Sequence, residues 1–248
     1  MQLQGQVAII TGAASGIGRV GALRFCAEGA RVLAVDLNAA GLEDVVREAT
    51  ANGGECLAHV ADVSRPEDVQ AMIKRAVDTW GRLDILWNNA AYYANRTSIS
   101  KSTLETWEKT IAVTLSAVFY GCKYALPVMM EQRRGVIINT SSAVIASPTN
   151  PYDIAKLGVV GVTIATAKEG GPYNVRCVAI APGIARTPAN PSVMAGDPAA
   201  IERAINAGLL PFMTEPEDIV NVAVFLCTDA ARCLTGCVIP VDRGQMAK

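Results

Sequence analysis

Near the start of the chain, the stretch VAIITGAASGIG (residues 7–18) joins a short apolar run to a glycine-rich turn and the beginning of a helix. Gly12, Gly16 and Gly18 allow a tight turn and let a pyrophosphate approach the helix N-terminus, where free N–H groups and the helix dipole favour anions. The alternative is an ordinary strand–helix turn that happens to be rich in glycine. The buried run before the turn and the acidic residue after the next run favour a dinucleotide site.

That acidic residue is Asp36, which ends the second apolar run, RVLAVD. A carboxylate at this point can accept hydrogen bonds from the adenosine ribose and repels a 2′-phosphate. Position 37 is Leu, and the turn between Gly12 and Gly18 carries no basic residue, so we expect NAD rather than NADP. Asp62 also ends a run and is a candidate neighbour of the adenine. For both aspartates the alternative is a loop or helix cap.

Short apolar runs alternate with longer amphipathic segments along the chain. The runs are VAIIT, RVLAVD, LDILWNN, GVIINTS, RCVAIAPG and CVIPVD. They lack polar alternation, which predicts strands buried on both faces of a parallel sheet, and segments such as PEDVQAMIKRAVDTWG have helical spacing. We therefore predict one doubly wound α/β domain spanning residues 1–248. The proline-rich stretch at about 184–212 is the exception and is interpreted as a loop with short helices that covers the substrate.

Composition excludes several other classes of protein. The net charge of −1 offers no basic surface for nucleic acid, and no uninterrupted apolar run reaches the length of a membrane span. The N-terminal stretch lacks the basic region of a secretory signal, and the odd number of cysteines fits a reducing compartment, so we expect a cytoplasmic protein. Cys227, Cys233 and Cys237 lack metal-ligand spacing, and we expect no metal site. The single histidine, His59, is expected to be structural or exposed.

The segment TNPYDIAK, residues 149–156, supplies the best acid/base candidate. Tyr152 and Lys156 lie four residues apart and so share one face of a helix. A tyrosine has an ordinary pKa of about 10, but a nearby ammonium and a positively charged nicotinamide ring favour the phenolate and lower that pKa. A solvated i,i+4 pair is the alternative. With one histidine in the chain, Ser–His catalysis has little support.

Together these motifs resemble the short-chain dehydrogenase/reductase family over nearly the whole chain. The matching segments are TGAASGIG (residues 11–18), Asp36, ADV (61–63), NNA (88–90), NTSS (139–142), Tyr152, Lys156, APG (181–183), Thr187 and GCVIPVDRG (236–244). The resemblance implies a seven-stranded Rossmann fold, a homotetramer or homodimer, and hydride transfer between a nicotinamide cofactor and an alcohol or ketone.

The resemblance also implies roles for individual residues. Tyr152 corresponds to the acid/base, Lys156 to its partner and a ribose ligand, and Ser142 to the group that holds the substrate oxygen, with Ser141 as an alternative. The implied cofactor contacts are Gly12, Ser15, Gly16, Ile17, Gly18, Asp36, Asp62, Val63, Asn88, Asn89, Ala90, Lys156, Ile184 and Thr187.

Several positions depart from the family pattern. Thr114 stands where the family has an asparagine that supports a proton path to the lysine, partly through its backbone carbonyl, and we expect the path to survive in altered form. The interval from Ser142 to Tyr152 is shorter than usual, which affects the substrate pocket. Ala91 and Arg243 replace glycines and restrict the backbone, and Val178 replaces an asparagine.

The expected pocket rim is apolar. It comprises Tyr92, Tyr93, residues 143–145, Met194, Leu209, Leu210 and Met213. We therefore expect a hydrophobic or aromatic secondary alcohol as substrate, with packing as the alternative role for several of these side chains. The apolar helix after Lys156 is a candidate subunit contact. A ketone or 3-oxoacyl reductase and a catalytically silent NAD-binding sensor or scaffold are the competing functions.

Overall fold

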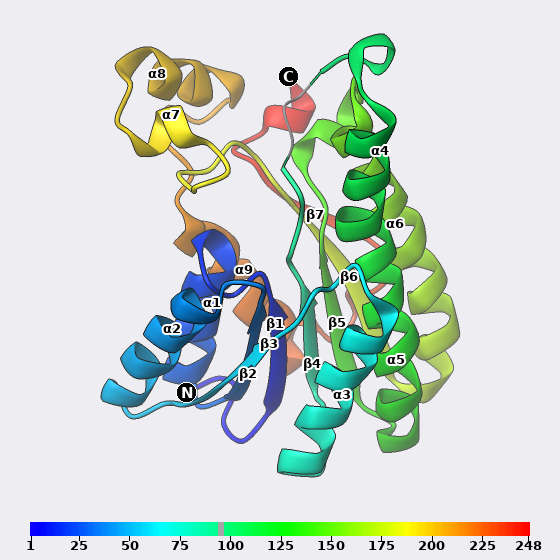
Figure 1. Ribbon diagram of the computed structural model, residues 1–248. Helices are drawn as coiled ribbons and strands as arrows, with labels where there is room; N and C mark the ends of the chain where they lie inside the picture. Colours follow the sequence, from blue (N-terminus) through cyan, green and yellow to red (C-terminus); the bar gives the residue numbers. More distant parts are fainter. Residues whose placement is uncertain (94–96) are drawn as a thin grey trace.

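The computed structural model describes residues 1–93 and 97–248 and contains a seven-stranded parallel sheet with strand order β3-β2-β1-β4-β5-β6-β7 (Figure 1). The strands are β1 (Val7–Thr11), β2 (Arg31–Asp36), β3 (Glu55–Val60), β4 (Ile85–Asn88), β5 (Gly135–Thr140), β6 (Val175–Pro182) and β7 (Val238–Val241). The doubly wound sheet predicted from the apolar runs is confirmed. The strand order reverses between β1 and β4, the point at which such sheets bind ligands.

The helices occupy the segments between the strands. They are α1 (Gly16–Ala27), α2 (Ala39–Ala51), α3 (Pro66–Trp80), α4 (Leu104–Ile111), α5 (Ala117–Gln132), α6 (Pro151–Gly170), α7 (Pro191–Met194), α8 (Pro198–Ala207) and α9 (Pro216–Leu226). Short helical turns are η1 (Ile99–Lys101), η2 (Ala112–Ser116), η3 (Ala143–Ala146), η4 (Gly171–Tyr173), η5 (Asp229–Ala231) and η6 (Gln245–Ala247).

Alternation of side chains along the strands creates a core on each face of the sheet. In β1, Ala8 and Ile10 pack in a core shared with α1, α2 and α9, whereas Val7 and Ile9 pack in a core shared with α3, α5 and α6. All five residues of β1 are buried, as its unbroken apolar sequence predicts. The two sets of helices are visible on opposite sides of the sheet in Figure 1.

The helix before β5 is interrupted by one π-helical turn, η2, so that α4, η2 and α5 form a continuous stretch. By length and composition alone, Leu104–Gln132 could cross a membrane, with a mean hydropathy of 1.4 and 39% of the window buried. Val118, Cys122 and Met129 of this stretch pack against the sheet. Because core helices pass the same test, the stretch is weak support for a membrane segment.

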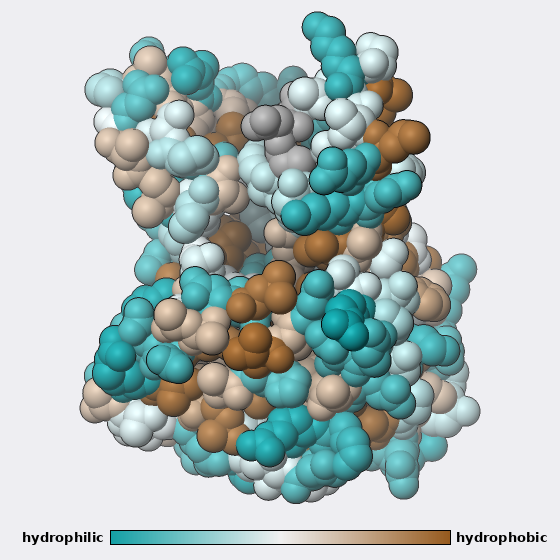
Figure 2. Space-filling view, viewed as in Figure 1, coloured by the Kyte–Doolittle hydropathy of each residue, from teal (hydrophilic) through white to brown (hydrophobic). Residues whose placement is uncertain are grey.

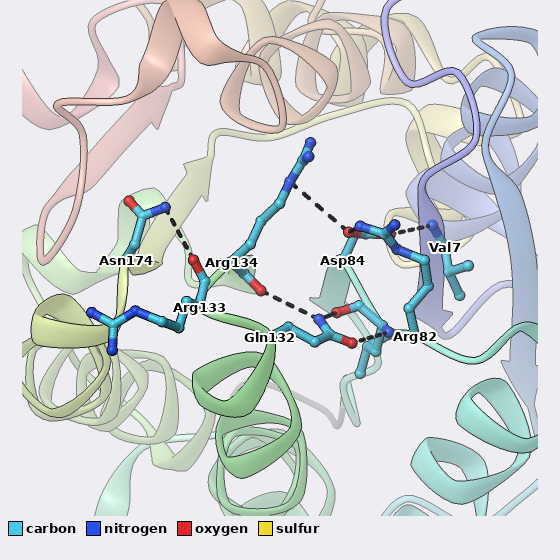
Figure 3. Close-up of polar contacts among 8 residues, drawn as sticks. Val7, Arg82, Asp84, Gln132, Arg133, Arg134 and Asn174 are labelled. Carbon is cyan, nitrogen blue, oxygen red and sulfur yellow. Dashed lines mark hydrogen bonds and ion pairs between the residues drawn. The ribbon is translucent and has the colours of Figure 1, made fainter.

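Buried Asp84 organises the end of the sheet that carries the strand N-termini (Figure 3). Its carboxylate accepts hydrogen bonds from the Val7 backbone N–H (2.9 Å) and from Arg82 Nε (2.8 Å). Nearby, the side-chain amide of Gln132 exchanges hydrogen bonds with the backbone N–H and carbonyl of Leu83. These contacts fix β1 and β4 against α5 and leave the opposite end of the sheet to form a site.

The segment between β6 and α9 stands apart from both cores. Val193, Ala200 and Ala204 form a small separate cluster, against which Ile184 and Met213 pack. In Figure 1, α7 and α8 lie beyond the carboxyl ends of the strands, away from the helices that flank the sheet. This segment, residues 184–214, is called the α7–α8 segment below.

Candidate active site

A cavity of about 620 Å³ lies at the carboxyl ends of the strands. It is lined from the turn after β1, the ends of β2 to β6, the beginning of α6 and the start of the α7–α8 segment. Figure 2 shows the surface hollowed between the part of the molecule that carries α7 and α8 and the part below it. The motifs that are dispersed in the sequence therefore converge on one space.

The glycine-rich turn has the backbone geometry that its composition predicts. Gly12 and Gly16 have φ values of 69° and 54°, a region that favours glycine, and both line the cavity. Gly18 does not line it, and its part is to allow close packing: a Cβ there would lie 2.1 Å from the Gly12 carbonyl oxygen. Gly18 therefore supports the turn, and its direct contact with a cofactor stays a prediction.

The N-terminus of α1 opens onto the cavity. Ser15, Gly16 and Ile17 line the cavity, and within the described ranges no side chain caps this helix at Ser15. Uncapped backbone N–H groups at the positive end of a helix dipole are suited to a phosphate. Because the turn is also free of a Cβ where it approaches Ala90, the residues present fit a dinucleotide pyrophosphate.

Asp36 fixes the loop around it and also faces the cavity. Its carboxylate accepts hydrogen bonds from the backbone N–H groups of Ala14 and Asn38, both at 3.0 Å, and the residue also lines the cavity. Asp62 similarly accepts hydrogen bonds from the N–H and hydroxyl of Ser64 while lining the cavity. Both aspartates fix the loops that bear them, and Val63 lies beside Asp62 in the cavity wall.

The structure corrects the expectation for Asn88. Its side chain is buried away from the cavity, where its amide donates to the Asn139 side chain at 2.9 Å, because successive strand residues point to opposite faces. Asn89 and Ala90 do line the cavity. Thr11 holds this segment, since its hydroxyl oxygen accepts hydrogen bonds from the backbone N–H groups of both residues.

Lys156 is fully enclosed between β5 and α6. Its Nζ donates to the Thr140 carbonyl oxygen at 2.6 Å, and the Lys156 carbonyl oxygen accepts from the Ser141 hydroxyl at 2.9 Å. The two bonds join the end of β5 to the first turns of α6. Burial, which disfavours the ammonium, lowers the pKa of Lys156 from its ordinary value of 10.5 to about 7.

Tyr152 is positioned by the N-terminus of α6. Asn150 caps the helix by accepting from the backbone N–H groups of Tyr152 and Asp153, and Asp153 accepts from the N–H of Thr149. Lys156 Nζ lies 5.6 Å from the centroid of the Tyr152 ring. Both residues line the cavity, so the i,i+4 pair faces it as the helical spacing predicts.

The two adjacent serines have different surroundings. Ser141 is 1% exposed and its hydroxyl is engaged with α6, as described above. Ser142 lines the cavity at the start of η3, and its Oγ is 3.5 Å from the backbone N of Val144. Of the two, Ser142 therefore has the hydroxyl more accessible to a ligand.

Thr114 does not line the cavity. It is fully buried in the π-helical turn η2, and its hydroxyl oxygen accepts from the backbone N–H of Tyr92 at 3.1 Å. The neighbouring Val113 reaches the cavity instead. The side chain of Thr114 therefore supports the loop after β4.

The α7–α8 segment contributes Ile184 and Thr187 to the cavity, as the APG motif implies. The sequence did not identify Gln245, which also lines the cavity and whose Oε1 is 3.4 Å from the backbone N of Ile184. It follows a turn near the C-terminus and belongs to no motif with a mechanism. Pro188 and Asn190, in the same segment, were missed for the same reason.

The expected apolar rim is only partly present. Tyr93, Ala143 and Val144 line the cavity, whereas Tyr92, Ile145, Met194, Leu209, Leu210 and Met213 do not. The Tyr92 ring instead contacts Lys109 Nζ at 4.7 Å. Tyr93 packs edge-on against Tyr152, with 5.0 Å between ring centroids, and so narrows the approach to the phenol.

Other reactive side chains lie outside this cavity. His59 is partly exposed on the edge strand β3, and burial and Arg75 lower its pKa. The seven cysteines are free thiols. In residues 1–93 and 97–248, no group of three or more His, Cys, Asp and Glu side chains could hold a metal ion.

Comparison with known proteins places this site among oxidoreductases. A family model described as "Enoyl-(Acyl carrier protein) reductase" matches residues 12–246. The chain is 36% identical to the 3-oxoacyl-[acyl-carrier-protein] reductase of Thermotoga maritima, covering 98% of this chain and 99% of that one. It is 34% identical to the cyclohexanol dehydrogenase of an Acinetobacter species, covering 98% and 96%.

Solved structures agree with these similarities. The crystal structure of levodione reductase superposes with a TM-score of 0.93 at 36% identity and covers 99% of each chain. These relatives are named as reductases or a dehydrogenase, which are oxidoreductases of alcohols or ketones, and their family binds a nicotinamide dinucleotide. The sequence motifs, the seven-stranded sheet and these similarities together show that the chain belongs to the short-chain dehydrogenase/reductase family.

Proposed function

We propose that the protein transfers a hydride between NAD and a hydrophobic or aromatic secondary alcohol or its ketone, with Tyr152 as the acid/base. The observation that carries the proposal is the burial of Lys156 within 5.6 Å of the Tyr152 ring, on one wall of a cavity that also contains Ser142. Burying an ammonium lowers the stability of the folded protein. A pair with only a structural role would gain nothing from such burial, whereas an acid/base pair needs the ammonium next to the phenol.

In the oxidative direction, the Tyr152 phenolate takes the proton of the substrate hydroxyl. The Lys156 ammonium, which donates to the Thr140 carbonyl oxygen, stabilises that phenolate. The negative phenolate in turn favours the ammonium and so opposes the effect of burial on the pKa of Lys156. The Ser142 hydroxyl donates to the substrate oxygen. A nicotinamide dinucleotide bound in this cavity would supply the acceptor for the hydride that leaves the carbon bearing this oxygen. The backbone carbonyl of Thr114 is proposed to take part in a proton path from Lys156 to solvent, with the threonine hydroxyl supporting the adjoining loop.

The preference for NAD rests on the end of β2. The Asp36 carboxylate lines the cavity, and Leu37, which is 65% exposed, offers no positive charge to a 2′-phosphate. Asp62 and Val63 are proposed to contact the adenine, and Asn89, Ala90, Ile184 and Thr187 the remainder of the cofactor. Ser15, Gly16 and Ile17 are proposed to bind the pyrophosphate.

The preference for a hydrophobic substrate rests on the side chains around Tyr152. Tyr93, Ala143 and Val144 offer apolar and aromatic surface and few groups that could hold several hydroxyls. The name cyclohexanol dehydrogenase on one relative is consistent with a cyclic secondary alcohol as the probe. We propose a cytoplasmic enzyme with residues 184–212 as a substrate lid.

Assembly into a homotetramer or homodimer is part of the proposal. Phe119 on α5 is 52% exposed, and Leu157 and Ile164 on α6 are 45% and 39% exposed. These helices cover the same face of the sheet, and their exposed apolar side chains are suited to burial against a second copy. Sedimentation measurements at micromolar concentration would test this part separately.

The function is tested by incubating the protein with NAD and a panel of secondary alcohols, including cyclohexanol, and following NADH. Turnover with NAD is expected to exceed turnover with NADP. Faster reduction of a 3-oxoacyl ester with NADPH would favour the competing reductase, which the Thermotoga relative suggests. Tight NADH binding without turnover of any substrate would favour a silent sensor.

A further inference from the structure

Arg243 has an unusual place in the fold. It follows β7 with φ of 57°, and the side chain is buried, with 8% of the residue exposed. The left-handed region is unfavourable for a residue with a Cβ, and it persists where surrounding contacts determine it. The left-handed conformation of Arg243 therefore indicates that the contacts of this residue fix it in place.

The guanidinium joins several parts of the α7–α8 segment. Its Nε donates to Thr214 Oγ1 at 2.9 Å, and its Nη1 donates to the carbonyl oxygens of Ile205 (3.0 Å) and Leu210 (2.9 Å). Its Nη2 donates to the carbonyl oxygen of Ala204. Ala204 and Ile205 belong to the last turn of α8, where free carbonyls and the helix dipole favour a cation.

The packing around the guanidinium is close. A Cβ at Gly208 would lie 2.9 Å from Arg243 Nη1, so the chain passes directly over the charged group. The Arg243 carbonyl oxygen also accepts from the backbone N–H of Leu209 at 2.7 Å. The residue thus holds the end of α8 and the bend that follows it, residues 208–212, with both its side chain and its backbone.

Arg243 is linked to the cavity wall through two neighbouring groups of residues. Thr214 forms a β-bridge with Ala185, at the beginning of the α7–α8 segment. On the other side, Asp242 accepts from the N–H groups of Gly244 and Met246 and fixes the turn that presents Gln245 to the cavity. Arg243 therefore connects both ends of the α7–α8 segment to a turn that forms part of the cavity wall.

We propose that Arg243 is a positioning residue that holds the α7–α8 segment over the substrate end of the cavity. The apolar cluster of this segment has three buried residues, so the guanidinium supplies much of what keeps the segment in place. Loss of the guanidinium weakens substrate binding and leaves the chemical step at Tyr152 unchanged. The inference rests on the proposed function, although the position of the segment can be measured without turnover.

The test variant is Arg243→Gly, because glycine accepts the backbone conformation at this position and removes only the side chain. We expect KM for a secondary alcohol to rise about tenfold or more, as for the loss of a hydrogen bond to a charged group, with kcat changed less than about twofold. Cleavage of the ligand-free protein by trypsin or chymotrypsin within residues 195–214 is expected to accelerate by a similar factor. Free guanidinium ion, at concentrations well below those that unfold the protein, is expected to restore protection and lower KM.

The matched control is Lys248→Ala. Lys248 Nζ also contacts the end of α8, at the Asn206 carbonyl oxygen, but from the exposed chain terminus. We expect its proteolysis rate and KM to match those of the wild type. An equal concentration of NaCl controls for ionic strength in the rescue.

Wild-type proteolysis and KM in Arg243→Gly would overturn the proposal. If Arg243 had only a structural role, Arg243→Gly would lower the melting temperature and kcat, would leave KM unchanged, and would not be rescued by guanidinium. That result would also contradict the proposal. If the wild type turned over no alcohol, the proposed function would fail, while the proteolysis and its rescue would still decide the role of Arg243.

Discussion

The glycine-rich turn at residues 11–18 and the α7–α8 segment border the same cavity but are held in different ways. The turn continues into α1, whose Ala22 and Phe25 belong to a main core cluster on the sheet. The α7–α8 segment has three buried apolar residues of its own and depends on polar contacts, chiefly those of Arg243. The glycine-rich turn is therefore expected to unfold with the whole domain, and the α7–α8 segment to open locally.

The largest effect is expected for Gly18→Ala. The new Cβ would meet the Gly12 carbonyl oxygen at 2.1 Å, and the backbone of the turn must move. We expect a loss of about 1–3 kcal/mol in the free energy of unfolding, typical of overpacking, together with weaker NADH binding. Urea denaturation and a fluorescence titration with NADH measure the two quantities.

Gly171→Ala is the matched control, because a Cβ there meets nothing within 4 Å. It is expected to leave unfolding and NADH binding close to the wild-type values. If Gly18→Ala behaved like this control, the close packing of the turn would not be what forms the site.

A second prediction concerns Lys156, which lies between the two regions. Because burial lowers its pKa to about 7, the folded protein has lost this proton between about pH 7 and 10 while the unfolded chain still holds it. The unfolded state binds more protons in that window, so the free energy of unfolding rises with pH there. Lys156→Met lacks this rise and is expected to be more stable than the wild type at pH 6, by at least about 1 kcal/mol.

Urea denaturation of both proteins at pH 6, 7, 8 and 9 gives the difference directly. The advantage of Lys156→Met is expected to shrink as the pH rises, and its activity to be lost. A difference that stayed constant from pH 6 to pH 9 would show that the charge of Lys156 does not oppose folding.

A third prediction separates the charge of Asp36 from its structural role. Asp36→Asn removes the negative charge and keeps one oxygen that can accept from the Ala14 N–H, whereas the hydrogen bond from the Asn38 N–H to the second oxygen is lost. We expect about tenfold weaker NAD binding and a shift of preference toward NADP, as for the loss of a hydrogen bond to a charged group. Titration with both cofactors measures the ratio, and an unchanged ratio would refute the assignment. Asp44→Asn, which removes an exposed carboxylate on α2 outside the cavity, serves as the control.

The smallest effect compares equivalent helix caps in the two regions. Asp197 caps α8 by accepting from Ala199 N–H, and Asn38 caps α2 by accepting from Gly41 N–H. Replacement of either by alanine removes about 1 kcal/mol. We expect Asn38→Ala to lower the melting temperature, and Asp197→Ala to leave it unchanged while cleavage within residues 195–214 accelerates. Equal shifts in melting temperature would break the distinction between the regions.

The same contrast explains what the sequence could predict. The turn, Asp36 and the Tyr152–Lys156 pair are local patterns in which spacing determines geometry, and the structure brings them to one cavity. Asn88 was assigned wrongly because both residues of an asparagine pair at a strand end fit the motif, and only the pleat decides which one faces the ligand.

Apart from the two that follow the APG motif, the side chains of the α7–α8 segment that face the cavity could not be predicted from local patterns. Leu209, Leu210 and Met213 are apolar residues in an irregular segment, where no helix or strand period predicts which way a side chain points. The backbone of Leu209 and Leu210 is hydrogen-bonded to Arg243, which is distant in sequence. The contact of Gln245 with Ile184 likewise depends on the tertiary fold. Patterns within one element predicted several residues that the structure brings to one cavity, whereas contacts between distant elements form the rest of its wall.

The central claim is that Tyr152 performs acid/base catalysis on an alcohol with NAD bound. The direct measurement is kcat/KM for cyclohexanol oxidation by the wild type and by Tyr152→Phe, with NADH affinity measured for both. We predict that Tyr152→Phe binds NADH normally and loses at least about 100-fold in kcat/KM, the usual size of a general acid/base contribution. Full activity in Tyr152→Phe would contradict the mechanism.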